Sequence, residues 1–101
     1  MIRICRFTTP AMQDLEAIMD YIAEHSSYEA AEAFLKKANK KCSQLTNFPA
    51  LGRKRDELSP GVRSVPLDDY LIFYRMREEN IEILRIVSGY RDLDTLFVQD
   101  Y

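Results

Sequence analysis

Length, composition and charge limit what this chain can be. Its 101 residues suffice for one compact domain, which we expect to span residues 1–101. Hydrophobic residues make up 47% of the chain, a proportion that argues against disorder. The formal net charge of −2 and the pI near 5.4 argue against a general nucleic-acid binder. Any basic surface must therefore be local and offset by acidic residues elsewhere.

The two cysteines, Cys5 and Cys42, lack CxxC or CxxxH spacing. This spacing predicts neither a zinc site nor a disulfide framework, and we interpret both as small buried apolar residues. The N-terminal sequence MIRICRFTTP lacks the apolar segment of a signal peptide, and no run reaches membrane-spanning length. We therefore expect a cytoplasmic, soluble protein that does not engage a membrane.

A short strand and then a helix are predicted at the N-terminus. Residues 2–7, IRICRF, alternate as a strand does. Thr9 is a suitable N-cap, with Pro10 at the first helical position. Four apolar residues then follow at helical spacing and form one stripe: Leu15, Ile18, Met19 and Ile22.

A second amphipathic helix follows after a short break. Ser26 and Glu29 have the spacing of a capping box. The helical period then continues through Ala31, Phe34, Leu35, Ala38, Cys42 and Leu45. Phe48 precedes a proline and is expected to end the helix. Such a short break predicts that the two helices form an antiparallel hairpin.

A long loop and three strands complete the predicted elements. Residues 49–61 form the loop, and residues 62–67 a strand in which Pro66 indicates an early end or an edge position. Residues 70–77 and 81–88 are predicted to form a hairpin around Glu78-Glu79-Asn80.

The register of that hairpin predicts which face the helices cover. If Arg77 opposes Asn80, one apolar face carries Leu71, Phe73, Leu84 and Ile86. We expect the helices to pack on that face. The fold class is then α+β, with an N-terminal strand and an antiparallel helical hairpin packed on one face of a small, mostly antiparallel sheet.

The ionisable residues do not suggest a metal site or a hydrolase. His25 is the only histidine and is expected to lie exposed at the end of the first helix. The acidic pairs at 68–69 and 78–79 belong to predicted turns. With few glycines and no clustered ligands, we expect no cofactor and no metal.

Arginines are the better functional candidates, because their fixed charges suit an anionic partner. Arg53 and Arg55 in the long loop either bind such a partner or are neutralised by the acidic residues that follow. Arg63, Arg85 and Arg91 lack an evident local partner, apart from an aspartate beside Arg91. A further arginine, at position 75, is expected to pair with a glutamate at position 82 on the facing strand.

Four segments together resemble a known family. TPAMQDLEAIMDYIAEH, FPALGRKRDEL, PGVRSVPLDDYLIFYR and IEILRIVSGYRDLDTLF resemble, in that order, the RelE/ParE superfamily of toxins from bacterial toxin–antitoxin modules. The ParE branch, often labelled plasmid stabilisation proteins, is the best match, and the resemblance covers nearly the whole chain. It implies a fold of one strand, two helices and three strands.

The resemblance to the ParE branch also implies a function. A toxin of this branch stalls DNA gyrase by binding, without catalysis, and so blocks replication until a ParD-like antitoxin neutralises it. The antitoxin is expected to add an amphipathic helix and an acidic tail near Arg63, Arg85 and Arg91. A 2:2 assembly through the antitoxin's DNA-binding part is expected, and this chain itself should not touch DNA.

The RelE branch implies an alternative function, ribosome-dependent cleavage of mRNA. That chemistry needs cations at the scissile phosphate and a proton acceptor. On our matching, Arg63 and Arg91 take two of the arginine positions, but Phe97 takes that of a C-terminal tyrosine and has no ionisable group. Tyr90 or Tyr101 could replace it. The low pI favours the ParE branch, and an interaction module without toxicity is a third possibility.

Overall fold

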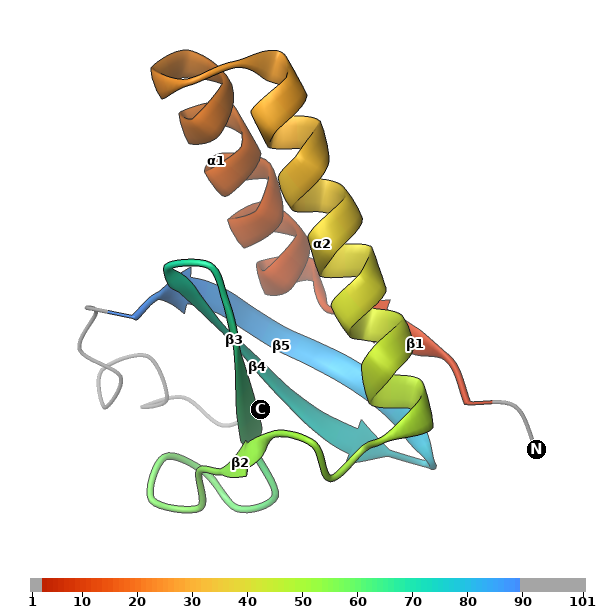
Figure 1. Cartoon of the computed structure of the whole chain (residues 1–101). Coiled ribbons are helices and arrows are strands. Elements are labelled where there is room, and N and C mark those ends of the chain that lie inside the picture. Colours follow the sequence, from red (N-terminus) through yellow and green to blue (C-terminus); the bar gives the residue numbers. More distant parts are fainter. Residues whose placement is uncertain (1–2, 90–101) are drawn as a thin grey trace.

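The computed structural model describes residues 3–89, which form a helical hairpin on a five-stranded sheet (Figure 1). The elements in chain order are β1 (Cys5–Phe7), α1 (Thr9–His25), α2 (Tyr28–Asn47), β2 (Arg53–Lys54), β3 (Arg63–Leu67), β4 (Tyr70–Arg77) and β5 (Asn80–Ser88). Within this part of the chain, no helix is both long and apolar enough to cross a membrane.

The strands are ordered β1-β5-β4-β3-β2 in the sheet. β1 runs parallel to β5, and the other pairs are antiparallel. This arrangement confirms the predicted α+β class. The sequence did not predict β2, whose two residues lie inside the expected loop and pair only with Arg63 and Ser64. Pro66 therefore lies beyond the reach of β2, at an open edge of β3 as expected.

Both helix starts lie one residue away from their predicted caps. Thr8, not Thr9, is the N-cap of α1, and its hydroxyl accepts a hydrogen bond from the Ala11 amide. The same hydroxyl donates to the Leu84 carbonyl on β5, so the cap also ties α1 to the sheet. Ser27, not Ser26, caps α2. A neighbouring threonine or serine meets the capping rule equally well, and for α1 the contact of Thr8 with Leu84 favours Thr8 over Thr9.

The helices bury the predicted apolar stripes against the sheet. Leu15 and Ile18 of α1 are buried, and so are Phe34, Ala38 and Leu45 of α2. They form one cluster with inward-facing residues of the strands, namely Val65, Leu67, Ile72, Tyr74, Ile81, Ile83 and Ile86. This cluster is the main core of the domain.

The predicted helix-facing side of the hairpin was right for Ile86, which lies in the main core, and wrong for the other three residues. Phe73 and Leu84 belong to a second cluster on the opposite face with Val62 and Val87, and Leu71 packs against it. Two features explain the error. Both faces of the central strands are apolar, so alternation alone does not identify the helix side. A bulge at Leu84 also pairs Phe73 with Arg85, which breaks the assumed register.

The β4–β5 turn consists of two glutamates. Arg77 pairs with Asn80 as predicted, which leaves Glu78 and Glu79 as the turn residues. Their φ angles are +53° and +68°, so both occupy the left-handed region. Turns with two such residues match the twist of a hairpin, but they favour asparagine and glycine.

The prediction for the cysteines was wrong in its main point. Cys5 of β1 and Cys42 of α2 form a disulfide, with their Cα atoms 5.8 Å apart. Only the burial of Cys42, which is 8% exposed, agrees with the expectation. The residues are 37 positions apart in sequence, and only the packing of α2 beside β1 brings them together.

Candidate functional site

Arg63, one of the arginines predicted as functional, holds the loop that follows α2. Its guanidinium donates to the Gly52 carbonyl at 2.8 Å and to the Ala50 carbonyl at 3.4 Å. Position 63 lies at the start of β3, opposite Tyr74 of β4, so the side chain reaches the loop that follows α2. These contacts give Arg63 a structural role in the described chain.

Tyr74 reinforces the same loop from within the core. Its side chain is fully buried, its hydroxyl donates to the Pro49 carbonyl, and it accepts from the Gly52 amide at 2.7 Å. Burial raises the pKa of the Tyr74 phenol, partly offset by the Gly52 hydrogen bond and by Arg63. A Cβ at Gly52 would lie 2.6 Å from the tyrosine ring, which explains the glycine. The shift keeps the phenol protonated, the opposite of what a general base needs.

Arg85 also makes internal contacts. Its guanidinium binds Asp14 of α1 through two hydrogen bonds, of 2.7 and 3.0 Å. The Asp14 carboxylate also accepts from the Ile86 amide at 2.9 Å. Both charged side chains are mostly buried, at 18% and 16% exposure. Arg85 therefore joins α1 to the bulged part of β5, and this contact was not predicted.

The loop arginines divide between two roles. Arg55 binds Glu57 at 2.8 Å, donates to Ser64 and lies over the Phe73 ring. The hydrogen bond and charge of Arg55 lower the pKa of the exposed Glu57 carboxyl. The sequence left two possibilities for Arg55, binding of an anionic partner or neutralisation by the acidic residues that follow it. The structure shows neutralisation, by Glu57. Arg53 lies exposed on β2 and keeps its fixed charge available.

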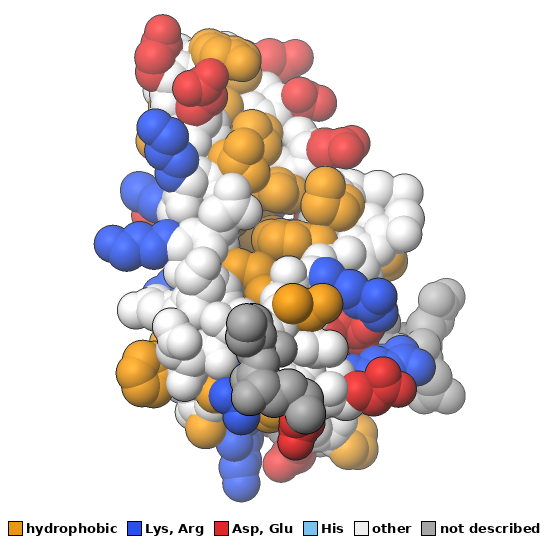
Figure 2. Space-filling model, turned by 90° about the vertical axis from the view of Figure 1, so that its right-hand side faces the viewer, with side chains coloured by type: hydrophobic (Ala, Val, Ile, Leu, Met, Phe, Trp, Pro, Cys, Tyr) orange, Lys and Arg blue, Asp and Glu red, His pale blue; other side chains and the backbone are white. Residues whose placement is uncertain are grey.

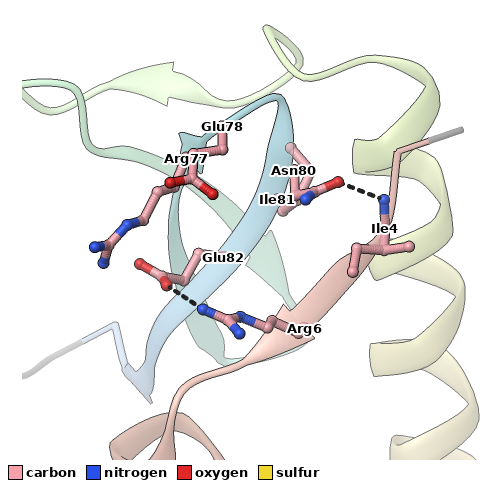
Figure 3. A pocket seen from close by; sticks show the side chains of 7 residues that line it. All are labelled: Ile4, Arg6, Arg77, Glu78, Asn80, Ile81 and Glu82. Atoms are coloured by element: carbon pink, nitrogen blue, oxygen red, sulfur yellow. Dashed lines mark hydrogen bonds and ion pairs between the residues drawn. The ribbon is translucent and has the colours of Figure 1, made fainter. Parts of the chain in front are cut away.

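Glu82 connects two arginines at the other end of the sheet. Its buried carboxylate binds Arg75 at 3.1 Å, which confirms the predicted pair across β4 and β5. The second oxygen binds Arg6 of β1 at 3.3 Å (Figure 3). The Arg6 side chain remains 68% exposed, so much of its donor capacity faces solvent. Arg6 was not among the predicted site residues, because its partner is contributed by a strand 76 positions away.

Three adjoining cavities lie along the end of β4 and beside the β4–β5 turn, and residues from their linings define what we call the hairpin-turn surface. The first, of about 250 Å³, is drawn in Figure 3. The second and third, of about 540 and 350 Å³, share Gly61 and Met76 with each other. The hairpin-turn surface consists of Ile4, Arg6, Pro60, Gly61, Arg63, Arg75, Met76, Arg77, Glu78, Asn80 and Glu82.

The hairpin-turn surface combines charge with exposed apolar atoms. Arg6 and Arg77 are exposed cations, and Ile4 and Met76 are large hydrophobic residues exposed to 55% and 43%. Arginines mixed with apolar residues are typical of protein interfaces. Such an arrangement can bind an anionic, partly apolar partner.

Other predicted residues add little chemistry. His25 is exposed at the end of α1, as expected, and stacks on Tyr21. Between residues 3 and 89, no three metal-ligating side chains gather. Tyr90, Arg91 and Phe97 lie outside the described residues.

A strand, a helical hairpin and an arginine-bearing sheet define a RelE/ParE-type domain. The family model of the ParE toxin of type II toxin–antitoxin systems, parDE, matches residues 5–93. The chain also matches Toxin ParE3 of Caulobacter vibrioides, with 33% identity over 86 residues that cover 85% of this chain and 86% of the relative. The chain therefore belongs to the ParE toxin family of type II toxin–antitoxin systems.

Solved structures share the fold. The chromosomal ParDE system of P. aeruginosa superposes with a TM-score of 0.73 at 26% identity, covering 86% of this chain and 96% of the other. The RelBE2 toxin–antitoxin complex of Mycobacterium tuberculosis gives a TM-score of 0.60 at 27% identity, covering 87% and 99%. Both branches of the superfamily thus carry this architecture.

Proposed function

We propose that this chain is a toxin that inhibits DNA gyrase by binding and so blocks replication. The main support is the ParE family match, which spans residues 5–93. The described chain adds a chemical argument, since its arginines are used for structure or lie on a surface suited to binding. Tyr74, which lies opposite Arg63 on β4, has a raised pKa, so it is poorly suited to accept a proton.

The proposed neutralising partner is a ParD-like antitoxin, in a 2:2 or larger assembly in the cytoplasm. Both solved relatives are toxin–antitoxin systems. Figure 2 shows hydrophobic side chains gathered along the side of the molecule that carries α2 and β1, with basic residues beside them. An amphipathic antitoxin helix would cover such a strip. Contacts with DNA would belong to the antitoxin.

The acidic antitoxin tail is proposed to reach the hairpin-turn surface. The expected positions Arg63 and Arg85 make internal contacts with the loop and with Asp14. Arg6 and Arg77 are more exposed and adjoin the apolar Ile4. Exposed guanidinium groups can pair with carboxylates at lower cost, because donors that face solvent are available without breaking an internal bond; Arg6 keeps such donors beside its pair with Glu82.

A second candidate function is ribosome-dependent mRNA cleavage. The likeness to the RelBE2 complex favours it, at a TM-score of 0.60. The environment of Arg63 counts against it, because that guanidinium binds two loop carbonyls. A phosphate-stabilising role would have to share the guanidinium with these loop contacts, both of which use the same nitrogen, Nη1.

A supercoiling assay tests the proposed function. Purified toxin is added to gyrase, relaxed plasmid and ATP, and a parallel reaction contains ribosomes and mRNA. We expect blocked supercoiling or trapped cleaved plasmid, with intact mRNA. Normal supercoiling together with codon-register cuts in mRNA would overturn the proposal in favour of the second candidate.

A further inference from the structure

The Cys5–Cys42 disulfide crosslinks a short edge strand to the longer of the two helices. β1 has three residues, lies at one end of the sheet and, within residues 3–89, pairs with β5 alone. α2 has 20 residues and supplies Cys42 from its inner face. The bond therefore joins β1 covalently to α2, although the whole of α1 lies between them in sequence. Apart from the bond, β1 and α2 are in contact through packing.

The two cysteine residues differ in their exposure to solvent. Cys42 is 8% exposed and belongs to the main core cluster. Cys5 is half-buried and packs at the margin of that cluster. We therefore assign the Cys5 sulfur as the one that a small thiol attacks and Cys42 as the leaving group.

We propose that Cys5 and Cys42 form a reversible redox site that exchanges with low-molecular-weight thiols of the glutathione class and sets the stability of the toxin. Disulfides in the cytoplasm, where we place the protein, are usually transient and redox-sensing. The proposed site adds a control on the toxin that does not depend on its target.

The exchange balances with glutathione alone. A glutathione thiolate attacks the Cys5 sulfur, the S–S bond breaks, and Cys42 leaves as a thiolate that takes up a proton. A second glutathione thiolate attacks the mixed disulfide and releases glutathione disulfide and the Cys5 thiolate, which is also protonated. The chain gains two electrons and two protons, and two glutathione molecules are oxidised to one disulfide. Excess glutathione disulfide drives the reverse reaction.

Reduction should loosen the toxin without unfolding it. The Ile81 amide donates to the Ile4 carbonyl at 2.8 Å, and the Ile4 amide donates to Asn80 at 3.0 Å. The Arg6–Glu82 ion pair holds β1 independently as well. The strand therefore keeps its place when the crosslink opens, but the unfolded chain regains the freedom of a loop of 37 residues. A less stable toxin opens more often to proteases.

A redox titration tests the exchange. The full chain is equilibrated in buffers with varied ratios of reduced to oxidised glutathione, unfolded in acid and labelled with a maleimide of known mass. Mass spectrometry should show a transition from an unlabelled to a doubly labelled chain as the ratio of reduced to oxidised glutathione rises to the values found in the cytoplasm. Two labels under fully oxidising conditions would overturn the proposal. So would an unlabelled chain at every ratio, because the bond would then be permanent.

Urea unfolding tests the effect on stability. In the wild type, dithiothreitol should lower the unfolding midpoint by roughly 2 M, given the size of the closed loop and the urea sensitivity of a small domain. Cys5→Ser should unfold at the same midpoint with and without dithiothreitol. Cys42→Ala repeats this control at the other cysteine and should also show no effect of dithiothreitol. Each variant is compared with itself, with and without dithiothreitol, so any effect of the substitution on folding cancels. An unchanged wild-type midpoint would overturn the proposal, and neither assay involves gyrase or an antitoxin.

Discussion

Tyr74 shows how one hydroxyl can organise a loop. It satisfies both the Gly52 amide and the Pro49 carbonyl from inside the core. Tyr74→Phe removes this partner from two polar groups, so we expect unfolding to become easier by about 1–3 kcal/mol. Urea unfolding followed by circular dichroism measures the change. Tyr28→Phe is the matched control, since Tyr28 is 69% exposed, and an equal effect of the two substitutions would refute the assignment.

The raised pKa of Tyr74 predicts a loss of stability at high pH. Burial is the main cause of the shift, so the protonated phenol is favoured in the folded chain. Its contribution is fully present below the unfolded pKa of about 10 and is lost as the pH rises through the folded pKa. Tyr74→Phe should therefore lose less stability than the wild type as the pH rises above about 10. Parallel decline of both proteins, measured as urea midpoints, would show that other groups control alkaline unfolding.

Asp14 and Asp68 allow the same substitution to be compared in two settings. Asp14 accepts from Arg85 and from the Ile86 amide in a mostly buried site. Asp68 pairs with Lys37 where both side chains are about half exposed, at 45% and 55%. Asp14→Asn should cost about 2 kcal/mol of unfolding free energy, and Asp68→Asn less than about 1 kcal/mol. The reverse order in thermal unfolding would mean that the Asp14–Arg85 pair is not important for the fold.

At the scale of elements, the two residues of the β4–β5 turn are poorly suited to its backbone conformation. Glu78 and Glu79 both have positive φ angles, where non-glycine residues cost about 1–2 kcal/mol each. Replacing the pair by Asn-Gly should stabilise the chain by about 1 kcal/mol and raise the melting temperature by roughly 4–8 °C. A Gln-Gln variant controls for the loss of charge. Equal melting temperatures for the two variants would show that charge, not backbone geometry, limits the turn.

Most elements could be predicted because local signals agree with one another. The stripes of α1 and α2 and the strong β pattern of residues 70–88 each have a clear period. The two-residue β2 has no such period. It exists because the chain after α2 is held beside β3 through tertiary contacts from Arg63 and Tyr74.

The errors concern contacts between distant elements. The helix-facing side of the hairpin could not be inferred, because both faces of β4 and β5 are apolar and a bulge interrupts the register. The disulfide required knowing that β1 passes beside α2. Patterns along the chain carry no information on either arrangement.

At the scale of the whole molecule, an acidic chain presents a local arginine surface. The net charge is −2, yet Arg6, Arg75 and Arg77 gather around one turn. Among the arginines predicted from sequence, Arg63 and Arg85 make internal contacts in the fold. An unpaired arginine in sequence is often paired in space, so candidates must be selected by exposure in the fold.

If the acidic antitoxin tail binds the hairpin-turn surface, a charge reversal on that surface should weaken the antitoxin complex. Arg77 is exposed beside Glu78, and Arg77→Glu would replace an attractive charge by a repulsive one. We expect the antitoxin complex to weaken by about tenfold or more, with faster dissociation, as measured by surface plasmon resonance. Lys54→Glu is the matched control, because Lys54 is exposed on β2, outside the hairpin-turn surface and away from α2, and makes the same change of charge. If the two variants weaken the complex equally, the effect reflects overall charge, and the tail must bind elsewhere.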